Sequence, residues 1–110
     1  MREVLVAFIS EKLKSDYVSL KEKKYEDKRL YESISNAIED LRENPLSGTK
    51  IQKKLWPKSY VQNYEITNLW KIDLIDAWRL IYTIESDEVR IVSIVLDFFD
   101  HKDYEKKFKY

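Results

Sequence analysis

The 110 residues of this chain suffice for one domain of ordinary size, and we expect a single domain over residues 1–110. Hydrophobic residues make up 44% of the chain and charged residues 36%, a mixture too apolar for a disordered protein and too rich in charge for a membrane span. Twenty basic and twenty acidic side chains cancel, which argues against the strongly basic profile of a dedicated nucleic-acid-binding protein.

Cysteine is absent and histidine occurs once, so disulfides, thiolate metal sites and histidine clusters are excluded. Any catalysis is therefore expected to be metal-free and to need no cofactor. The apolar run over residues 4–9 is shorter than the apolar core of about 7–15 residues in a signal peptide, and no small-residue cleavage site follows it. We therefore expect a cytoplasmic protein that does not bind membranes.

Residues 4–9 are β-branched and aromatic, which predicts a strand, and Ser10 follows as a candidate helix N-cap. The first helix is expected to begin near Ser10 and to end within residues 21–24, where its apolar stripe weakens. A second helical pattern follows and stops at Asn44, because Pro45 disfavours helical geometry in the residue before it. Its apolar face consists of Leu30, Ile34, Ala37, Ile38 and Leu41. Two amphipathic helices in succession predict a helical hairpin packed on a sheet.

Residues 46–66 show no clear period, although Pro57 suits the first turn of a short helix. This segment also holds a cluster of lysines without an acidic neighbour, formed by Lys50, Lys53, Lys54 and Lys58. A solvated loop is the simpler interpretation of such a cluster, and a nucleic-acid-binding surface is the alternative.

From residue 69 onward the apolar residues alternate, which predicts a β-hairpin. If the large side chains at even positions all face the helices, the hairpin loop must hold an odd number of residues, and residues 75–77 fit that loop. Asp73 then lies opposite Arg79, and Lys71 lies opposite Ile81. Lys71, Asp73 and Arg79 are therefore expected to share a face of the sheet that no helix covers.

Residues 85–88 form the next expected turn, and the nearly continuous apolar run over residues 89–99 predicts a strand in the middle of the sheet. Tyr104 and Phe108 are four residues apart and predict a short C-terminal helix turn, with Phe108 in the core. The expected fold class is thus α+β, with an N-terminal strand, a two-helix hairpin, an antiparallel meander of three strands and this last helix turn.

The candidate site combines Lys71 and Arg79 with His101, Lys102 and Tyr104, which follow the last strand. Arginine suits phosphate recognition because its planar fork donates two parallel hydrogen bonds, and histidine exchanges protons near neutrality. With a 2′-hydroxyl as nucleophile, such a set could cleave RNA without a metal ion. The alternatives are that Arg79 pairs only with Asp73 across the hairpin and that His101 only caps the last strand.

The three tryptophans could either stack on bases or belong to the core. Trp56, Trp70 and Trp78 are residue types that stack on bases, but the alternation predicts that Trp70 and Trp78 belong to the core.

The ordered set of segments resembles the RelE/ParE toxin superfamily of type II toxin–antitoxin systems. The resembling segments are Ala37-Ile38-Glu39-Asp40-Leu41, Asn44-Pro45-Leu46, Leu69-Trp70-Lys71-Ile72, Trp78-Arg79-Leu80-Ile81-Tyr82 and Asp100-His101-Lys102-Asp103-Tyr104. Members of the RelE branch are mRNA interferases, endoribonucleases that cut messenger RNA on the ribosome, inhibit translation and are neutralised by a cognate antitoxin. ParE-like relatives on the same fold poison DNA gyrase and lack the cleavage residues.

For the RelE branch, the resemblance implies that Arg79 contacts the scissile phosphate, with Lys71 beside it. His101 and Tyr104 would act in acid–base catalysis or stacking. The lysine cluster, together with Lys102, would contact ribosomal or messenger RNA. Asp73, opposite Arg79, would partly neutralise the phosphate site. The partners implied are the antitoxin and, for a nuclease, the ribosome and its messenger RNA, whereas a ParE-like or catalytically degenerate relative would only bind proteins.

Overall fold

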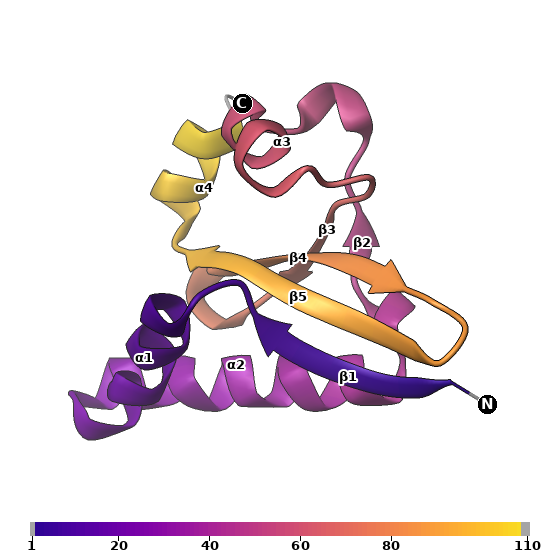
Figure 1. The fold of residues 1–110 in the computed structure, drawn as a ribbon. Coiled ribbons are helices and arrows are strands. Elements are labelled where there is room, and N and C mark those ends of the chain that lie inside the picture. The colour runs from indigo at the N-terminus through magenta and orange to yellow at the C-terminus, as the bar shows by residue number, and fades with distance from the viewer. Residues whose placement is uncertain (1, 109–110) are drawn as a thin grey trace.

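A mixed sheet of five strands forms the centre of the protein, as described over residues 2–108 by a computed structural model (Figure 1). The strands are β1 (Glu3–Phe8), β2 (Thr49–Lys50), β3 (Trp70–Asp73), β4 (Arg79–Ser86) and β5 (Arg90–Phe99). Their order across the sheet is β1-β5-β4-β3-β2, with β1 parallel to β5 and the other pairs antiparallel. The predicted α+β class, the N-terminal strand and the three-strand meander are confirmed, and the apolar last strand lies inside the sheet as expected.

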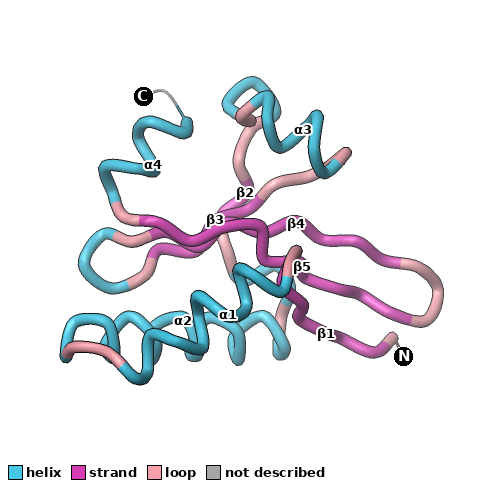
Figure 2. Tube along the Cα trace, turned by 60° about the vertical axis from the view of Figure 1, so that its left-hand side comes forward, coloured by secondary structure: helices cyan, strands magenta, loops and turns pink. Residues whose placement is uncertain are grey.

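The helical hairpin packs on one face of this sheet (Figures 1 and 2). Helix α1 (Glu11–Ser19) begins where predicted, because the Ser10 hydroxyl accepts a hydrogen bond of 3.1 Å from the Leu13 amide. A 3₁₀ turn (Leu20–Glu22) ends it, and helix α2 (Tyr25–Glu43) then runs to Asn44, where Pro45 stops it as expected. The chain thereby leaves the hairpin at the edge of the sheet that carries β2.

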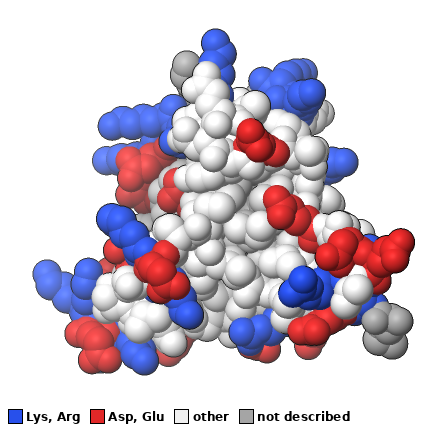
Figure 3. All heavy atoms as spheres, viewed as in Figure 1, with Lys and Arg blue, Asp and Glu red and all other residues white. Residues whose placement is uncertain are grey.

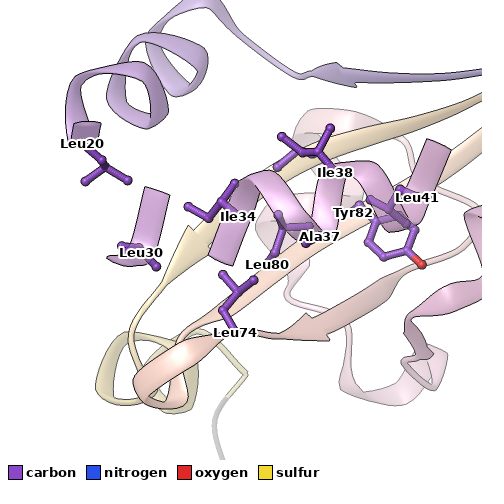
Figure 4. Close-up of a cluster of buried hydrophobic side chains, with 10 residues drawn as sticks. Leu20, Leu30, Ile34, Ala37, Ile38, Leu41, Leu74, Leu80 and Tyr82 are labelled. Carbon is purple, nitrogen blue, oxygen red and sulfur yellow. The ribbon is translucent and has the colours of Figure 1, made fainter. Parts of the chain in front are cut away.

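The first core lies between α2 and the sheet (Figure 4). All five predicted residues of the apolar face of α2 are buried there, together with Leu80 and Tyr82 of β4. Trp70, Ile72 and Trp78 pack against the same cluster, so their predicted place in the core is confirmed.

The register of the β3–β4 hairpin is the predicted one. Asp73 pairs with Arg79, and Lys71 pairs with Ile81. The loop consists of three residues, Ile75–Ala77, and is closed by a hydrogen bond of 2.8 Å from the Leu74 amide to the Trp78 carbonyl. Asp76 and Ala77 both take positive φ angles, 56° and 61°, in a turn that contains no glycine.

The expectation of a helix-free second face is wrong. Helices α3 (Lys58–Tyr64) and α4 (His101–Phe108) both lie over it (Figures 1 and 2). The physical reason is that this face is itself apolar between its charged positions: Ile81 of β4 and Leu69 are fully buried, and a sheet face of that kind must be covered. The members of this second core are Ile51, Tyr60, Ile66, Leu69, Ile81, Leu96, Phe99, Tyr104 and Phe108.

Two local features separate the last strands from the expected pattern. The register between β4 and β5 shifts next to Ile81, which pairs with Asp97, whereas Tyr82 pairs with Val95. This bulge lets residues of opposite parity, Leu96 and Phe99, enter the same second core. Strand β4 also continues through Ser86, two residues into the expected turn, and Asp87 closes the tighter turn by accepting from the amides of Val89 and Arg90.

Candidate functional site

Two cations and one carboxylate meet on neighbouring strands of the second face. Asp73 of β3 lies opposite Arg79 of β4, and Lys71 precedes Asp73 by two residues on the same side of β3. One carboxylate oxygen of Asp73, Oδ1, lies 3.0 Å from Lys71 Nζ and 3.0 Å from Arg79 Nε. The arginine contact is an ion pair whose geometry does not make a hydrogen bond, while Arg79 Nη1 donates to the Trp78 carbonyl at 3.2 Å. The predicted pairing of Asp73 with Arg79 is therefore confirmed.

Helix α4 brings the C-terminal candidates to these cations. It starts directly after β5, and Asp100 Oδ1 accepts from the Asp103 amide at 2.9 Å. His101 therefore belongs to the first turn of the helix and is not the cap. Its Nε2 atom lies 3.1 Å from Oε1 of Glu105, one turn further along.

Tyr104 is the buried member of the candidate set. It is 5% exposed and packs in the second core together with Phe108, whose predicted core position is confirmed. The guanidinium carbon of Arg79 lies 5.4 Å from the centre of the Tyr104 ring, a cation–π distance. Arg79 thus lies against an aromatic ring on one side and a carboxylate on the other.

All four candidate catalytic residues line one shallow hollow of about 250 Å³. Its lining consists of Lys71, Arg79, His101, Tyr104 and Glu105. The side chains of Lys71 and Arg79 are 23% and 20% exposed, so they can be reached from solvent only in part. The structure brings the predicted residues together, and their catalytic role stays a prediction.

None of the predicted RNA-binding lysines lines this hollow. Lys50 is on β2, Lys53 and Lys54 are in a 3₁₀ turn, Lys58 is the first residue of α3, and Lys102 is on α4. All five are exposed. Basic side chains stand out at the α3 and α4 end of the molecule, acidic ones gather at the end that carries the turn between β4 and β5, and both kinds mix over the helical hairpin (Figure 3). Zero net charge therefore conceals an uneven distribution.

Two acidic residues near the site were missed in the sequence. The spacing of four between His101 and Glu105 was the available signal, because residues so spaced are neighbours on a helix. Asp97 is the only charged residue within 91–99, and a carboxylate in so apolar a strand indicates a buried partner. That partner is Tyr60 of α3, whose hydroxyl donates to Asp97 Oδ2 at 3.2 Å. Burial raises the pKa of Asp97, although the Tyr60 hydrogen bond and the Lys107 charge oppose that shift.

A larger hollow of about 510 Å³ lies away from these residues, between β1 and the two helices of the hairpin. Phe8, Tyr17, Ile38 and Arg42 are among its lining residues. The Tyr17 and Ser35 hydroxyls are 2.5 Å apart across it, and they join α1 to α2. This groove has both apolar and charged walls.

Within residues 2–108, no group of three or more histidine and acidic side chains could hold a metal ion. Over the same part of the chain, no helix has the length and apolar character needed to cross a lipid bilayer.

Comparison with known proteins identifies the family. Residues 9–97 match the model of the ParE toxin of the type II toxin–antitoxin system parDE. The matched segment includes Lys71 and Arg79 and ends before His101, Lys102 and Tyr104. No curated protein sequence matches the chain, and no solved structure does. Because the match spans most of the chain, from the first helix into the last strand, this protein belongs to the ParE family of type II toxin–antitoxin toxins.

Proposed function

We propose that this toxin acts by binding DNA gyrase, as the ParE branch of the superfamily does, and does not cut RNA. The observation that carries the proposal is the position of Asp73, one oxygen of which contacts both Lys71 Nζ and Arg79 Nε at 3.0 Å. A site that stabilises the extra charge of a cleaving phosphate needs its cations directed at that phosphate. Here both cations are directed at a carboxylate of the protein itself.

The remaining candidate groups support the same conclusion. His101 Nε2 is 3.1 Å from Glu105 Oε1. This nitrogen therefore contacts a carboxylate of the protein, where a nuclease would need it to exchange a proton with RNA. Tyr104 of α4 is buried, with its ring against Arg79. The family match supports the proposal independently, since its matched residues contain the two strand cations and none of the α4 candidates.

A supercoiling assay with purified gyrase tests this proposal. Addition of the toxin is expected to inhibit supercoiling and to trap gyrase-cleaved DNA, and pre-incubation with its antitoxin should prevent both effects. Translating ribosomes with a reporter messenger RNA form the parallel arm, in which the message is expected to stay intact. Cleavage of the message on ribosomes, with gyrase unaffected, would overturn the proposal.

A metal-free endoribonuclease is the second candidate, and it is favoured by the convergence of Lys71, Arg79, His101 and Tyr104 on one hollow. The Asp73 side chain is 63% exposed, and ion pairs of that kind contribute under about 1 kcal/mol, so an incoming phosphate could displace it. Lys71 and Arg79 would then hold the phosphate while His101 serves as acid or base in 2′-hydroxyl attack. The surrounding lysines, Lys50, Lys53, Lys54, Lys58 and Lys102, would contact the RNA backbone.

Growth arrest separates the two candidates in cells. In the nuclease account, Arg79→Ala relieves growth arrest on expression and leaves the fold intact, and messenger RNA that wild-type toxin cuts stays whole. In the gyrase account, arrest is accompanied by DNA damage and not by messenger RNA loss.

Toxins of this family bind a cognate antitoxin, and we propose that an antitoxin helix occupies the groove between β1 and the helical hairpin. Its volume of about 510 Å³ and its mixed walls suit an amphipathic helix. Asn36 lines this groove, whereas Glu32, one turn earlier on α2, does not. Asn36→Trp should weaken antitoxin binding measured by calorimetry, and the matched control Glu32→Trp should not. Equal affinities for the two variants would place the antitoxin elsewhere.

A further inference from the structure

Asp97 occupies a position where a carboxylate is costly. It lies on β5 opposite Ile81, which is fully buried, in the face covered by α3 and α4. Its neighbour along that face, Phe99, is also buried. A charged group in such surroundings is tolerated only with partners, because burial without them disfavours the ionised form.

The partners of Asp97 come from both helices that cover this face. From α3, the Tyr60 hydroxyl donates to Asp97 Oδ2 at 3.2 Å. From α4, Lys107 attracts the carboxylate electrostatically, and its Nζ also lies 5.1 Å from the centre of the Tyr60 ring. Asp103, likewise on α4, repels it. Asp97 is therefore hydrogen-bonded to α3 and attracted by a charge on α4, and Lys107 also joins α4 to the Tyr60 ring.

The contacts continue from Tyr60 to the candidate site. The Tyr60 ring meets Phe108 edge-on, with 6.3 Å between ring centres. Phe108 in turn lies 4.7 Å from the Tyr104 ring, and Tyr104 lies over Arg79. Asp97 and Arg79 are thus joined by a continuous series of packed side chains that passes through both helices.

We propose that Asp97 is a positioning residue, which holds α3 and α4 on the sheet through Tyr60 and Lys107 and so keeps Tyr104 over Arg79. It does not line the hollow, so it would act there only through other side chains. This role does not depend on the target of the toxin, because it concerns how the face that carries the site is assembled. Loss of the role would leave the first core, around α2, in place.

Titration followed by NMR tests the connection in the intact protein. The pKa of Asp97 is raised by burial above the ordinary 3.8, so its carboxyl carbon should titrate above that value. If Asp97 positions α4, the ring signals of Tyr104 and the Arg79 Nε–H signal should show a step at the same pH. That step should vanish in Asp97→Asn and persist in Glu85→Gln, which alters an exposed carboxylate on β4. Persistence of the step in Asp97→Asn would overturn the proposal.

Hydrogen exchange supplies a second measurement that does not require the Asp97 variant to fold. Tyr60→Phe removes the hydrogen bond and leaves the carboxylate buried, so the pKa of Asp97 should rise further and the amides of α4 should exchange about tenfold faster. The amides of α2 should keep the wild-type rate, because their core is unchanged. Equal acceleration in α2 and α4 would mean that Tyr60 and Asp97 merely stabilise the whole protein, which contradicts a positioning role.

Discussion

On one face of the sheet, the 19-residue helix α2 lies along the strands and buries five aliphatic side chains against them. On the other face, helices of seven and eight residues are attached mainly by aromatic rings, with a half-buried carboxylate among them. The first arrangement maximises apolar contact and leaves few polar groups inside. The second leaves charged groups, among them Lys71, Asp73 and Arg79, at the border of its core. We therefore expect the first face to supply most of the stability, and the second face to contribute less because charged groups border its core.

The largest loss of stability is expected from truncating either of two adjacent residues of β4 that point to opposite faces of the sheet. Leu80 and Ile81 are both 0% exposed, so truncation of either to alanine should cost about 2–5 kcal/mol. Leu80→Ala should lie near the upper end, because α2 cannot move into the cavity without disturbing the whole first core. Ile81→Ala should lie near the lower end, since the short helices α3 and α4 can settle. Urea unfolding of both variants measures the loss in free energy of unfolding. A larger loss in Ile81→Ala than in Leu80→Ala would mean that the second face supplies more of the stability.

The contribution of Tyr82, on the first face, to stability should depend on pH in the alkaline range. Its hydroxyl donates to the Pro45 carbonyl at 2.8 Å and accepts from the Gly48 amide at 3.1 Å, so Tyr82→Phe should cost about 1–2 kcal/mol at neutral pH. Burial raises the pKa of Tyr82 from 10.0 to about 12. The unfolded chain therefore ionises first, and the contribution of this group is complete below pH 10 and is lost as the pH rises towards 12.

The free energy of unfolding, measured between pH 9 and 12, tests whether this stability is lost as the pH rises. The loss of stability with rising pH should be shallower in Tyr82→Phe than in the wild type, although the raised pKa of Tyr60 keeps part of the slope in both. An unchanged slope would mean that Tyr82 does not stay protonated in the folded protein at those pH values.

Ser10→Ala should destabilise the hairpin of the first face by about 1 kcal/mol, because the Leu13 amide loses its cap. Thermal unfolding measures this effect. Ser15→Ala, which changes an exposed serine within α1, is the control and should leave stability nearly unchanged or slightly higher. Equal effects of the two substitutions would show that the cap contributes nothing.

The smallest expected effect is stabilising and concerns the loop where the two faces meet. Ala77 has a φ of 61°, which an L-residue with a β-carbon adopts only at a cost, so Ala77→Gly should stabilise the protein by about 0.5–1 kcal/mol. Ala7→Gly, at a strand position with ordinary geometry, should be destabilising instead. A loss of stability in Ala77→Gly, measured by urea unfolding, would mean that the turn is not strained.

The first face could be predicted almost completely from the sequence. Leu30 to Leu41 follow one helical stripe, and the alternation around Ile72 and Leu80 specified the hairpin register and its three-residue loop. Local periodicity suffices there because each element has one apolar side. The second face could not be predicted in the same way, because α3 lies in a segment without a period and the bulge at Leu96 reverses the parity of β5.

In the candidate site, too, some contacts could be predicted from the sequence and others could not. The pairing of Asp73 with Arg79 followed from strand register, and it was predicted correctly. The approach of His101 and Tyr104 depends on how α4 folds back over the sheet, which is a long-range arrangement that neighbouring residues do not encode. Asp97 was overlooked because its significance depends on Tyr60, 37 residues away in the chain.

We propose that Asp73 and Glu105 keep the cationic site from acting on RNA, and Asp73→Asn is the variant that tests this. This variant removes the carboxylate charge and keeps the side-chain shape, so it frees Lys71 and Arg79 for phosphate. Wild type and Asp73→Asn should be compared on ribosomes programmed with messenger RNA and, in parallel, on purified gyrase. We expect the wild type to leave the message intact and to trap cleaved DNA on gyrase, and any cleavage of the message to appear only in Asp73→Asn. Message cleavage by the wild type that rises in Asp73→Asn and disappears in Arg79→Ala, with gyrase unaffected, would contradict this proposal.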